Sequence, residues 1–168
     1  MGKYIGERIL RKEDPRMVTG EAKYLEDIQL SGMVHAVVKR SDYAHAKIKN
    51  IDTSEAEKVP GVIGVWTGKD FEDVNPMPCA WQAGGVDNNA NTPRVLEIDK
   101  VTFTGQGVAV VVAEDRNIAE DASSKIVVDY EELPTVVSAE EAIKPGAPQL
   151  HENAPKNICM EWECGNQE

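Results

Sequence analysis

The first half of the chain contains short apolar segments with the two-residue period of β-strands. The segment MVHAVVKR (Met33–Arg40) predicts a strand with Val34, Ala36 and Val38 on one face. After the turn SDYAH, the segment AKIKNI predicts a second strand. The two could form a hairpin, although no two-residue turn signal fixes its register.

A helix, a third strand and a long loop are expected next. In the second strand, Ala46 and Ile48 are expected to point inward. Residues Thr53–Val59 begin with cap residues and end before a Pro-Gly pair, so they predict a short helix. The segment VIGVW (Val62–Trp66) predicts the third strand. From Asn75 to Pro93 the chain is rich in Gly, Pro and Asn, which predicts a functional, interface or disordered loop.

The second half has a more regular pattern. RVLEIDKVTFTG predicts two short strands, and the nearly continuous apolar run GVAVVVAE (Gly107–Glu114) predicts a strand buried on both faces. IVVDYEEL predicts a further strand, and Ser138 opens a short helix, AEEAI. Asp115 is expected to cap a helix whose apolar residues recur at helical spacing: Ile118, Ala119, Ala122 and Ile126.

Together these elements predict one α+β domain with a mixed sheet, two main helices and a long irregular loop. We expect the domain to cover residues 31–150, after an extended arm over residues 1–30 with one short strand around Ala22–Tyr24. Residues 151–168 are expected to begin a connection to a further domain, because the segment ends in ECGNQE without a closing element.

Composition and charge restrict the partners and the compartment. The 168 residues carry a formal net charge of −11 without a Lys/Arg cluster, so nucleic acids and anionic membranes are not expected as partners. No window approaches the roughly 18 apolar residues of a membrane-spanning helix. The charged start MGKYIGERILRKEDPR differs from a signal peptide, and three cysteines favour a reducing compartment. We therefore expect a cytoplasmic protein.

A Gly-x-Gly followed by an apolar strand and a helix is reminiscent of nucleotide-binding proteins. Their phosphate loop lies between the strand and the helix, where amides at the helix N-terminus point at the anion. Here Gly105 and Gly107 precede the strand, and the turn after it carries the carboxylates of Glu114 and Asp115. Because these carboxylates would repel a pyrophosphate, we interpret the glycines as a turn or bulge that leads into a buried strand.

The cysteines near the C-terminus suggest a metal site only weakly. Four residues separate Cys159 from Cys164, and His151 lies eight positions before Cys159. Structural zinc sites usually pair two such spacings, and the chain has only three cysteines. Because ICMEWEC also alternates like a strand, we interpret it as a strand that leads out of the domain. The acidic pairs lack calcium-loop spacing and are expected to be solvated.

The sequence assigns no catalytic residue. Cys79 lies in the irregular loop without a nearby base or helix N-terminus to activate a thiol. His35 and His45 could serve as general bases, but a histidine hydrogen-bonded to the backbone is the more common arrangement. No serine lies in the Gly-x-Ser-x-Gly turn of an α/β-hydrolase, so an independent small hydrolase has little support.

Positive charge is concentrated in the N-terminal arm of this otherwise acidic chain. Arg8, Arg11 and Arg16 lie there together with Lys12 and Lys23. Arms of this kind often pack on a partner subunit, so the three arginines are predicted to contact a partner. The alternative is a solvated, partly ordered terminus.

Four blocks of the sequence resemble, in the same order, the N-terminal α/β-hammerhead domain of one enzyme family. The blocks are EDPRMVTGEAKYLEDIQLSGMVHA, KRSDYAHAKIKNIDTSEAEKVPGVIGVWTGKD, GQGVAVVVAEDRNIAEDASSKIVVDYEELP and KPGAPQLHENAPKN. From about Gly6 to Asn157 the chain is similar to the molybdenum-binding large subunit of the xanthine dehydrogenase, aldehyde oxidase and carbon monoxide dehydrogenase family. The match is poor over Asn75–Pro93.

The resemblance implies a hammerhead fold and a parent oxidoreductase several times longer than this chain. The molybdopterin cofactor and the catalytic glutamate would lie in downstream molybdenum-binding domains, so no catalytic, cofactor-binding or metal-binding residue is expected here. Iron–sulfur and flavin subunits or domains are the other expected partners. We therefore predict a non-catalytic structural or assembly domain that is inactive alone. The alternative is a free-standing small subunit that assembles with a separate cofactor-binding chain.

Overall fold

The computed structural model describes most of the 168-residue chain, namely residues 4–79, 89, 91–163 and 165. The chain divides into two compact units, Met1–Met33 (unit 1) and Val34–Glu168 (unit 2). None of the described helices is both long and apolar enough to span a bilayer.

Unit 1 contains two short helical segments, α1 (Asp14–Val18) and the 3-10 helix η1 (Leu25–Asp27). Proline in the first turn favours the start of α1, because its missing N–H has no partner there in any helix. The strand expected around Ala22–Tyr24 is wrong. The amide of Tyr24 instead donates to Oδ2 of Asp27 (2.8 Å), which turns the chain into η1.

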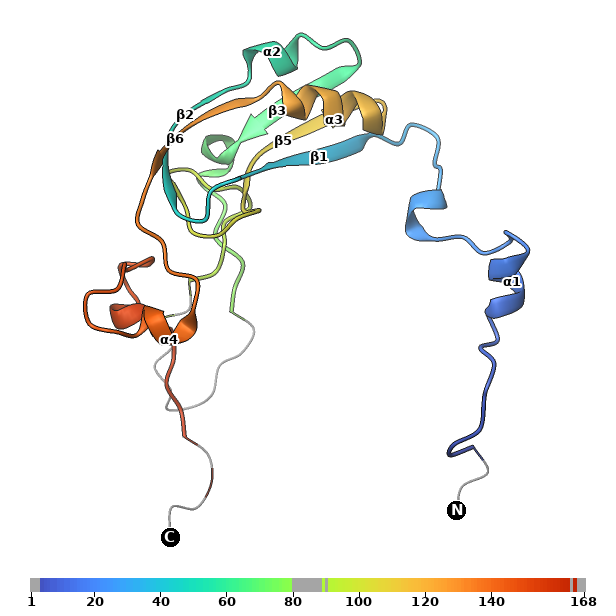
Figure 1. Ribbon diagram of the computed structural model, residues 1–168. Helices are drawn as coiled ribbons and strands as arrows, with labels where there is room; N and C mark the ends of the chain where they lie inside the picture. Colours follow the sequence, from blue (N-terminus) through green and yellow to red (C-terminus); the bar gives the residue numbers. More distant parts are fainter. Residues whose placement is uncertain (1–3, 80–88, 90, 164, 166–168) are drawn as a thin grey trace. The chain divides into compact units, whose positions relative to one another are not determined.

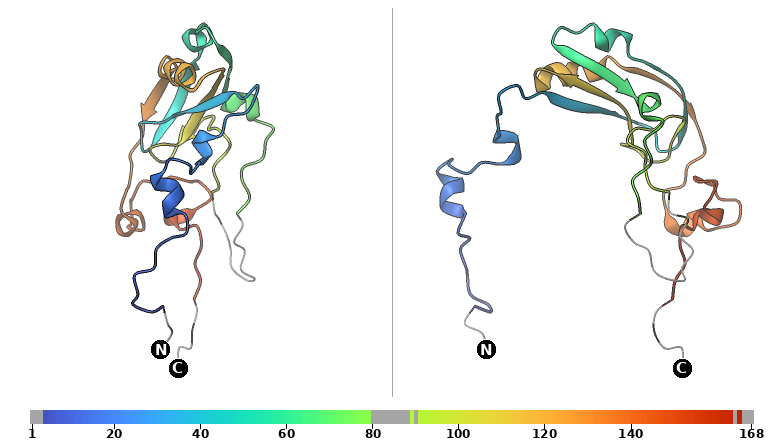
Figure 2. Two further views of the ribbon diagram at one scale, coloured as in Figure 1. Left: turned by 90° about the vertical axis from the view of Figure 1, so that its right-hand side faces the viewer. Right: turned by 180° about the vertical axis from the view of Figure 1, so that it is seen from behind.

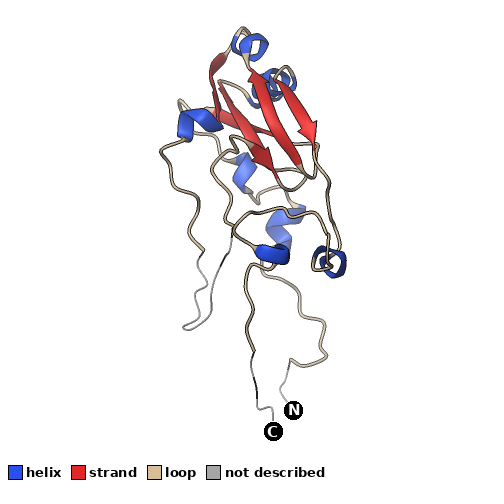
Figure 3. Cartoon of the chain, turned by 90° about the vertical axis from the view of Figure 1, so that its left-hand side faces the viewer, coloured by secondary structure: helices blue, strands red, loops and turns tan. Residues whose placement is uncertain are grey.

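Unit 2 is an α+β domain with few helices, as expected (Figure 1). Its elements are β1 (His35–Arg40), β2 (Ala46–Asp52), α2 (Ser54–Glu57), β3 (Val62–Thr67), the 3-10 helix η2 (Gly68–Phe71), β4 (Lys100–Val101), β5 (Gly107–Ala113), α3 (Arg116–Ser124), β6 (Val127–Glu132), α4 (Ala139–Ala142) and the 3-10 helix η3 (Pro155–Asn157). The strands, red in Figure 3, form two three-stranded sheets. Sheet A has the order β1-β5-β3 and sheet B the order β4-β2-β6, and every described strand pair is antiparallel.

The hairpin between the first two strands does not form, because β1 and β2 belong to different sheets. Strand β1 pairs with β5, and β2 pairs with β6. Between them, the amide of Ser41 donates to the carbonyl of Gln106 and the amide of Gly105 donates to the carbonyl of Ser41, both at 2.8 Å. Gly105 has a φ of +94°, which confirms the predicted turn before β5.

Two further strand predictions are wrong in part. Of the two strands expected over residues 94–105, only the two-residue β4 forms. Glu97 is held instead by hydrogen bonds, from its amide to the carbonyl of Gly107 (2.9 Å) and from Gln106 to its carboxylate (2.7 Å). The segment 158–163 has a single bridge residue, Met160, in place of the expected strand.

The helical prediction for α3 is confirmed in detail. Its Asp115 cap accepts a hydrogen bond from the amide of Asn117 (2.8 Å). The four predicted apolar residues lie in one core cluster with α2 and sheet A. Figures 1 and 2 show α3 alongside sheet A. Sheet B contributes to the same core through Ile51 and Val128, which joins the two sheets.

The expected burial of β5 on both faces is wrong in part: Val108 at the start of the strand is fully buried, but the face opposite the helices is less covered farther along. Val111 is fully buried against the helices, whereas Val110 and Val112 on the opposite face are only partly buried. In β1, the predicted apolar face is likewise the exposed one: Val34 is 50% and Val38 36% exposed. The inward prediction for β2 holds, because Ala46 is fully buried and Ile48 packs in its cluster.

Candidate functional site

The three arginines predicted to contact a partner lie exposed in unit 1. Nε of Arg11 lies 3.0 Å from Oδ1 of Asp14, within an exposed ion pair of little energetic weight. The carbonyl of Arg16 accepts hydrogen bonds from the amides of Glu21 and Ala22, both at 2.9 Å. These contacts shape the unit locally and leave the guanidinium of Arg16 exposed.

Unit 1 also exposes its apolar side chains. No residue from Tyr4 to Met33 is buried. The most exposed large apolar residues of the unit are Val18, Ile5 and Leu25, at 87%, 85% and 83%. Because residues 4–33 form no hydrophobic core, their apolar side chains are available to another surface.

His45 is bonded to the backbone, as the sequence favoured. Its Nδ1 lies 2.6 Å from the carbonyl oxygen of Pro134, and since a carbonyl can only accept, Nδ1 carries the proton. The carbonyl of His45 accepts from the amide of Leu133 (2.9 Å). Within the described part of the chain, the buried Nε2 has no hydrogen-bond partner. The imidazole thus holds the start of β2 to the segment after β6.

His151 lies in an open cleft of about 610 Å³. Burial lowers its pKa, and the positive charge of Lys100 lowers it further. The cleft also contains Glu97 and Gln106, which bond to each other, while Nζ of Lys100 donates to the carbonyl of Leu150 (2.7 Å). Glu97, Gln106 and Lys100 are thus bonded within the chain, and the cleft carries both signs of charge, so it does not define a site for one charged ligand.

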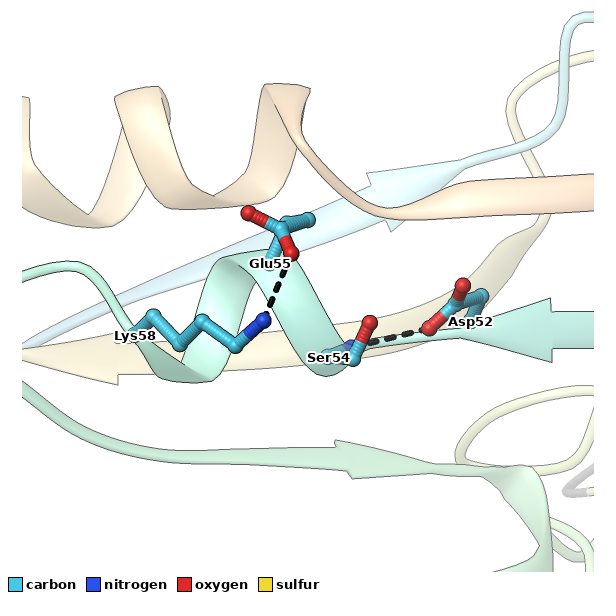
Figure 4. A network of polar contacts seen from close by, with 4 residues as sticks. All are labelled: Asp52, Ser54, Glu55 and Lys58. Atoms are coloured by element: carbon cyan, nitrogen blue, oxygen red, sulfur yellow. Dashed lines mark hydrogen bonds and ion pairs between the residues drawn. The ribbon is translucent and has the colours of Figure 1, made fainter.

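The polar network at the start of α2 (Figure 4) has shifted pKa values, although its side chains are exposed. The amide of Ser54 donates to Asp52 (3.0 Å), and Nζ of Lys58 lies 2.7 Å from Glu55. The pKa of Asp52 is lowered mainly by the hydroxyl and then by the amide of Ser54, and that of Glu55 by Lys58. The network fixes the first turn of the helix that buries Ala56, which is a structural role.

The cysteines do not form a described metal site. Cys79 and Cys159 are not in disulfides, and Cys164 lies outside the described residues. Among residues 4–79, 89, 91–163 and 165, no group of three or more His, Cys, Asp and Glu side chains could hold a metal ion. The carbonyl of Cys159 accepts from the amide of Asn89 (2.7 Å), which joins the C-terminal segment to the long loop.

The N-terminus of α3 is already occupied by a carboxylate of the chain itself. The N-terminus of α3, which follows β5, is the place where a doubly wound fold would bind a pyrophosphate. Here Asp115 already accepts from the Asn117 amide, and its pKa is lowered by that bond. The carboxylate of Asp115 lies where the pyrophosphate would bind, so the helix N-terminus is stabilised by a residue of the chain itself.

The sequence interpretation missed the relationship between Gly64 and Trp66 in β3. A Cβ atom placed on Gly64 would lie 2.5 Å from Cη2 of Trp66, so the indole lies directly over the glycine. The available signal was the glycine itself, since glycine inside a strand often marks a close approach of another group.

Comparison with known proteins gives consistent matches over most of the chain. Residues 19–134 match the family model described as "Aldehyde oxidase and xanthine dehydrogenase, a/b hammerhead domain". The carbon monoxide dehydrogenase large chain of Afipia carboxidovorans is 39% identical over 170 residues, covering 94% of this chain and 20% of that one.

Solved structures agree with this match. Quinoline 2-oxidoreductase from Pseudomonas putida 86 is similar with a TM-score of 0.76 and 40% identity, over 88% of this chain and 18% of that one. A Cu,Mo-CO dehydrogenase is similar with a TM-score of 0.72 and 40% identity over the same shares. The chain therefore spans about a fifth of the length of the relatives that it matches.

Proposed function

The chain belongs to the aldehyde oxidase and xanthine dehydrogenase a/b-hammerhead family, and from this premise we propose that it is a structural and assembly domain of a molybdenum hydroxylase large chain. The observation that supports this role most is the use of its polar groups. Polar groups of His45, of the cleft around His151 and of Asp115 at the start of α3 form hydrogen bonds within the chain. The arm and one face of sheet A instead expose apolar side chains. Such a chain is suited to packing and offers little for catalysis.

The catalytic residues and the molybdopterin cofactor are then carried by the part of the large chain that has no counterpart here. One of the similar structures is a Cu,Mo-CO dehydrogenase, which fits a molybdenum-containing parent. Iron–sulfur and flavin subunits or domains are the further partners, with Arg8, Arg11 and Arg16 as contacts, and the cytoplasm is the compartment. We divide the chain into an arm (1–30), the hammerhead domain (31–150) and a connection (151–168).

Deletion from the gene of the complete large chain tests the proposal. Without residues 1–168, the large chain should fail to assemble with its partner subunits and should lose its molybdenum. Supplying the 168-residue chain in trans should restore part of both. Assembly is measured by size-exclusion chromatography and molybdenum by elemental analysis. Normal assembly and metal content after the deletion would contradict an assembly role, and molybdenum bound to the 168-residue chain alone would contradict its non-catalytic character.

A further inference from the structure

The face of sheet A that points away from the buried helical core is apolar. Directly paired residues of antiparallel strands point to the same face. Val38 pairs with Val110 and Val110 with Trp66, so these three side chains form one row across the sheet. The neighbouring row on the same face consists of Ala36, Val112 and Gly64, because Val112 pairs with both of the others. We call this surface the open face; it consists of Ala36, Val38, Gly64, Trp66, Val110 and Val112.

Both faces of sheet A are apolar, but the described helices pack only against the face opposite the open face. On the other face, Val37, Val111 and Val65 form the equivalent row, and all three belong to the core packed by α2 and α3. Val38 and Trp66 are each 36% exposed, and neither of the two described core clusters includes an open-face residue. Strand β5 is central in its sheet, so the incomplete burial of Val110 and Val112 is not an edge effect.

Trp66, on the outer strand β3, gives the open face its one aromatic side chain. The indole lies over Gly64, where a Cβ atom would approach Cη2, Cζ2 and Cζ3 to between 2.5 and 3.0 Å. It therefore lies along the sheet and presents its outer side. Large aromatic side chains held in this way are typical energetic centres of protein interfaces. No residue of the open face is charged, which is typical of surfaces that stay buried in permanent contacts.

We infer that the open face packs against the part of the large chain that has no counterpart in this sequence, through an apolar surface of that part. The matched region is 20% of the Afipia carboxidovorans large chain, so about four-fifths of such a chain is available to cover it. The nearly continuous apolar sequence of β5 has the pattern of a strand buried on both faces, and this contact completes that burial. The inference rests on the proposed function.

Hydroxyl-radical footprinting of Trp66 tests the contact directly. Its oxidation rate is measured in the 168-residue chain and in the complete large chain that carries this sequence. We expect at least a tenfold lower rate in the complete chain, with the peptide assigned through a Trp66→Phe variant. Equal rates in the two proteins would overturn the inference.

A matched pair of substitutions tests the energetic contribution. Val38→Lys places a charge on the open face, and Val127→Lys does the same at a valine of sheet B that is 65% exposed. In the complete large chain, Val38→Lys should lower the melting temperature by at least about 5 °C more than Val127→Lys. In the 168-residue chain the two variants should differ little. A similar effect of both variants in the complete chain would contradict the inference.

Other occupants give different results, each of which overturns the inference. If the arm covers this face, removal of residues 1–33 from the 168-residue chain will raise the oxidation rate of Trp66. If a second copy covers it, sedimentation will show a concentration-dependent dimer that Val38→Lys dissociates. Failure of the proposed function can be told apart from failure of this inference. The former appears as normal assembly after deletion of the domain, whereas the latter appears in the oxidation rate of Trp66.

Discussion

Nδ1 of His45 lies 2.6 Å from the carbonyl oxygen of Pro134, although the two residues are 89 positions apart. His45 is 6% exposed, so the bond is sheltered from water. His45→Phe keeps the ring volume but leaves the Pro134 carbonyl without its donor. We expect a loss of about 1–3 kcal/mol in the free energy of unfolding, measured by urea denaturation.

His45→Asn is the matched control, because its amide nitrogen can occupy the position of Nδ1. It should lose less stability than His45→Phe despite its smaller volume. If the phenylalanine variant is the more stable of the two, the hydrogen bond does not contribute as described.

Two glycines that both have close neighbours should respond differently to alanine. At Gly68 the new Cβ would lie 2.4 Å from the carbonyl oxygen of Glu97, a backbone atom. At Gly64 it would meet the end of the Trp66 side chain, which can move. Gly68→Ala should therefore cost about 1–3 kcal/mol and Gly64→Ala less. Gly64→Ala should also shift the ¹⁹F NMR signal of 5-fluorotryptophan at position 66; an unchanged signal would contradict the contact.

Asp115 should protect the start of α3 from fraying. Its pKa is lowered by hydrogen bonds from the Asn117 and Ile118 amides, so its contribution is present above the unfolded pKa, near 3.8. This contribution is lost as the pH falls through the lower, folded value. Asp115→Ala should lower the melting temperature at neutral pH and speed amide exchange at Asn117. Asp115→Asn retains an acceptor and should lose less; equal losses would indicate that capping is not the cause.

The His151 environment predicts a dependence of stability on pH. The pKa in the folded state is lowered by burial and by Lys100, so the unfolded state binds more protons around its own pKa of 6.5. Stability from this group is therefore present above that value and is lost as the pH falls through it toward the folded pKa. Between about pH 7.5 and pH 5, the wild type should lose more thermal stability than His151→Gln. A parallel decline of both proteins would contradict this assignment.

The arm arginines should act on assembly more than on folding. In the intact enzyme, Arg8→Ala with Arg16→Ala should weaken subunit association, because both side chains are exposed and no residue from Tyr4 to Met33 is buried. The melting temperature of the 168-residue chain should change little. Lys49→Ala with Lys144→Ala removes the same charge from exposed sites of unit 2 and serves as control. A larger effect on the melting temperature than on association would refute the contact.

The local elements were predictable and their partners were not. The helix α3 follows from the Asp115 cap and apolar spacing within a single segment, so the sequence indicates it directly. Strand pairing depends on residues far apart, which is why β1 and β2 read as neighbours although each pairs elsewhere. The His45 bond to Pro134 has the same origin. The partial exposure of Val110 and Val112 in β5 could not be predicted, because the nearly continuous apolar sequence of this strand is typical of burial on both faces.

The strand order of sheet A has a consequence for synthesis on the ribosome. Strands β1 and β3 are both made before β5, yet among the described strands each of them pairs only with β5. During translation the two outer strands therefore emerge from the ribosome first and remain unpaired until the central strand has been synthesised. Pairing strands that are far apart in the sequence closes a large loop before the strands gain their contacts, and topologies of this kind fold slowly. The nascent chain is thus most vulnerable to aggregation in the interval before residues 107–113 leave the exit tunnel.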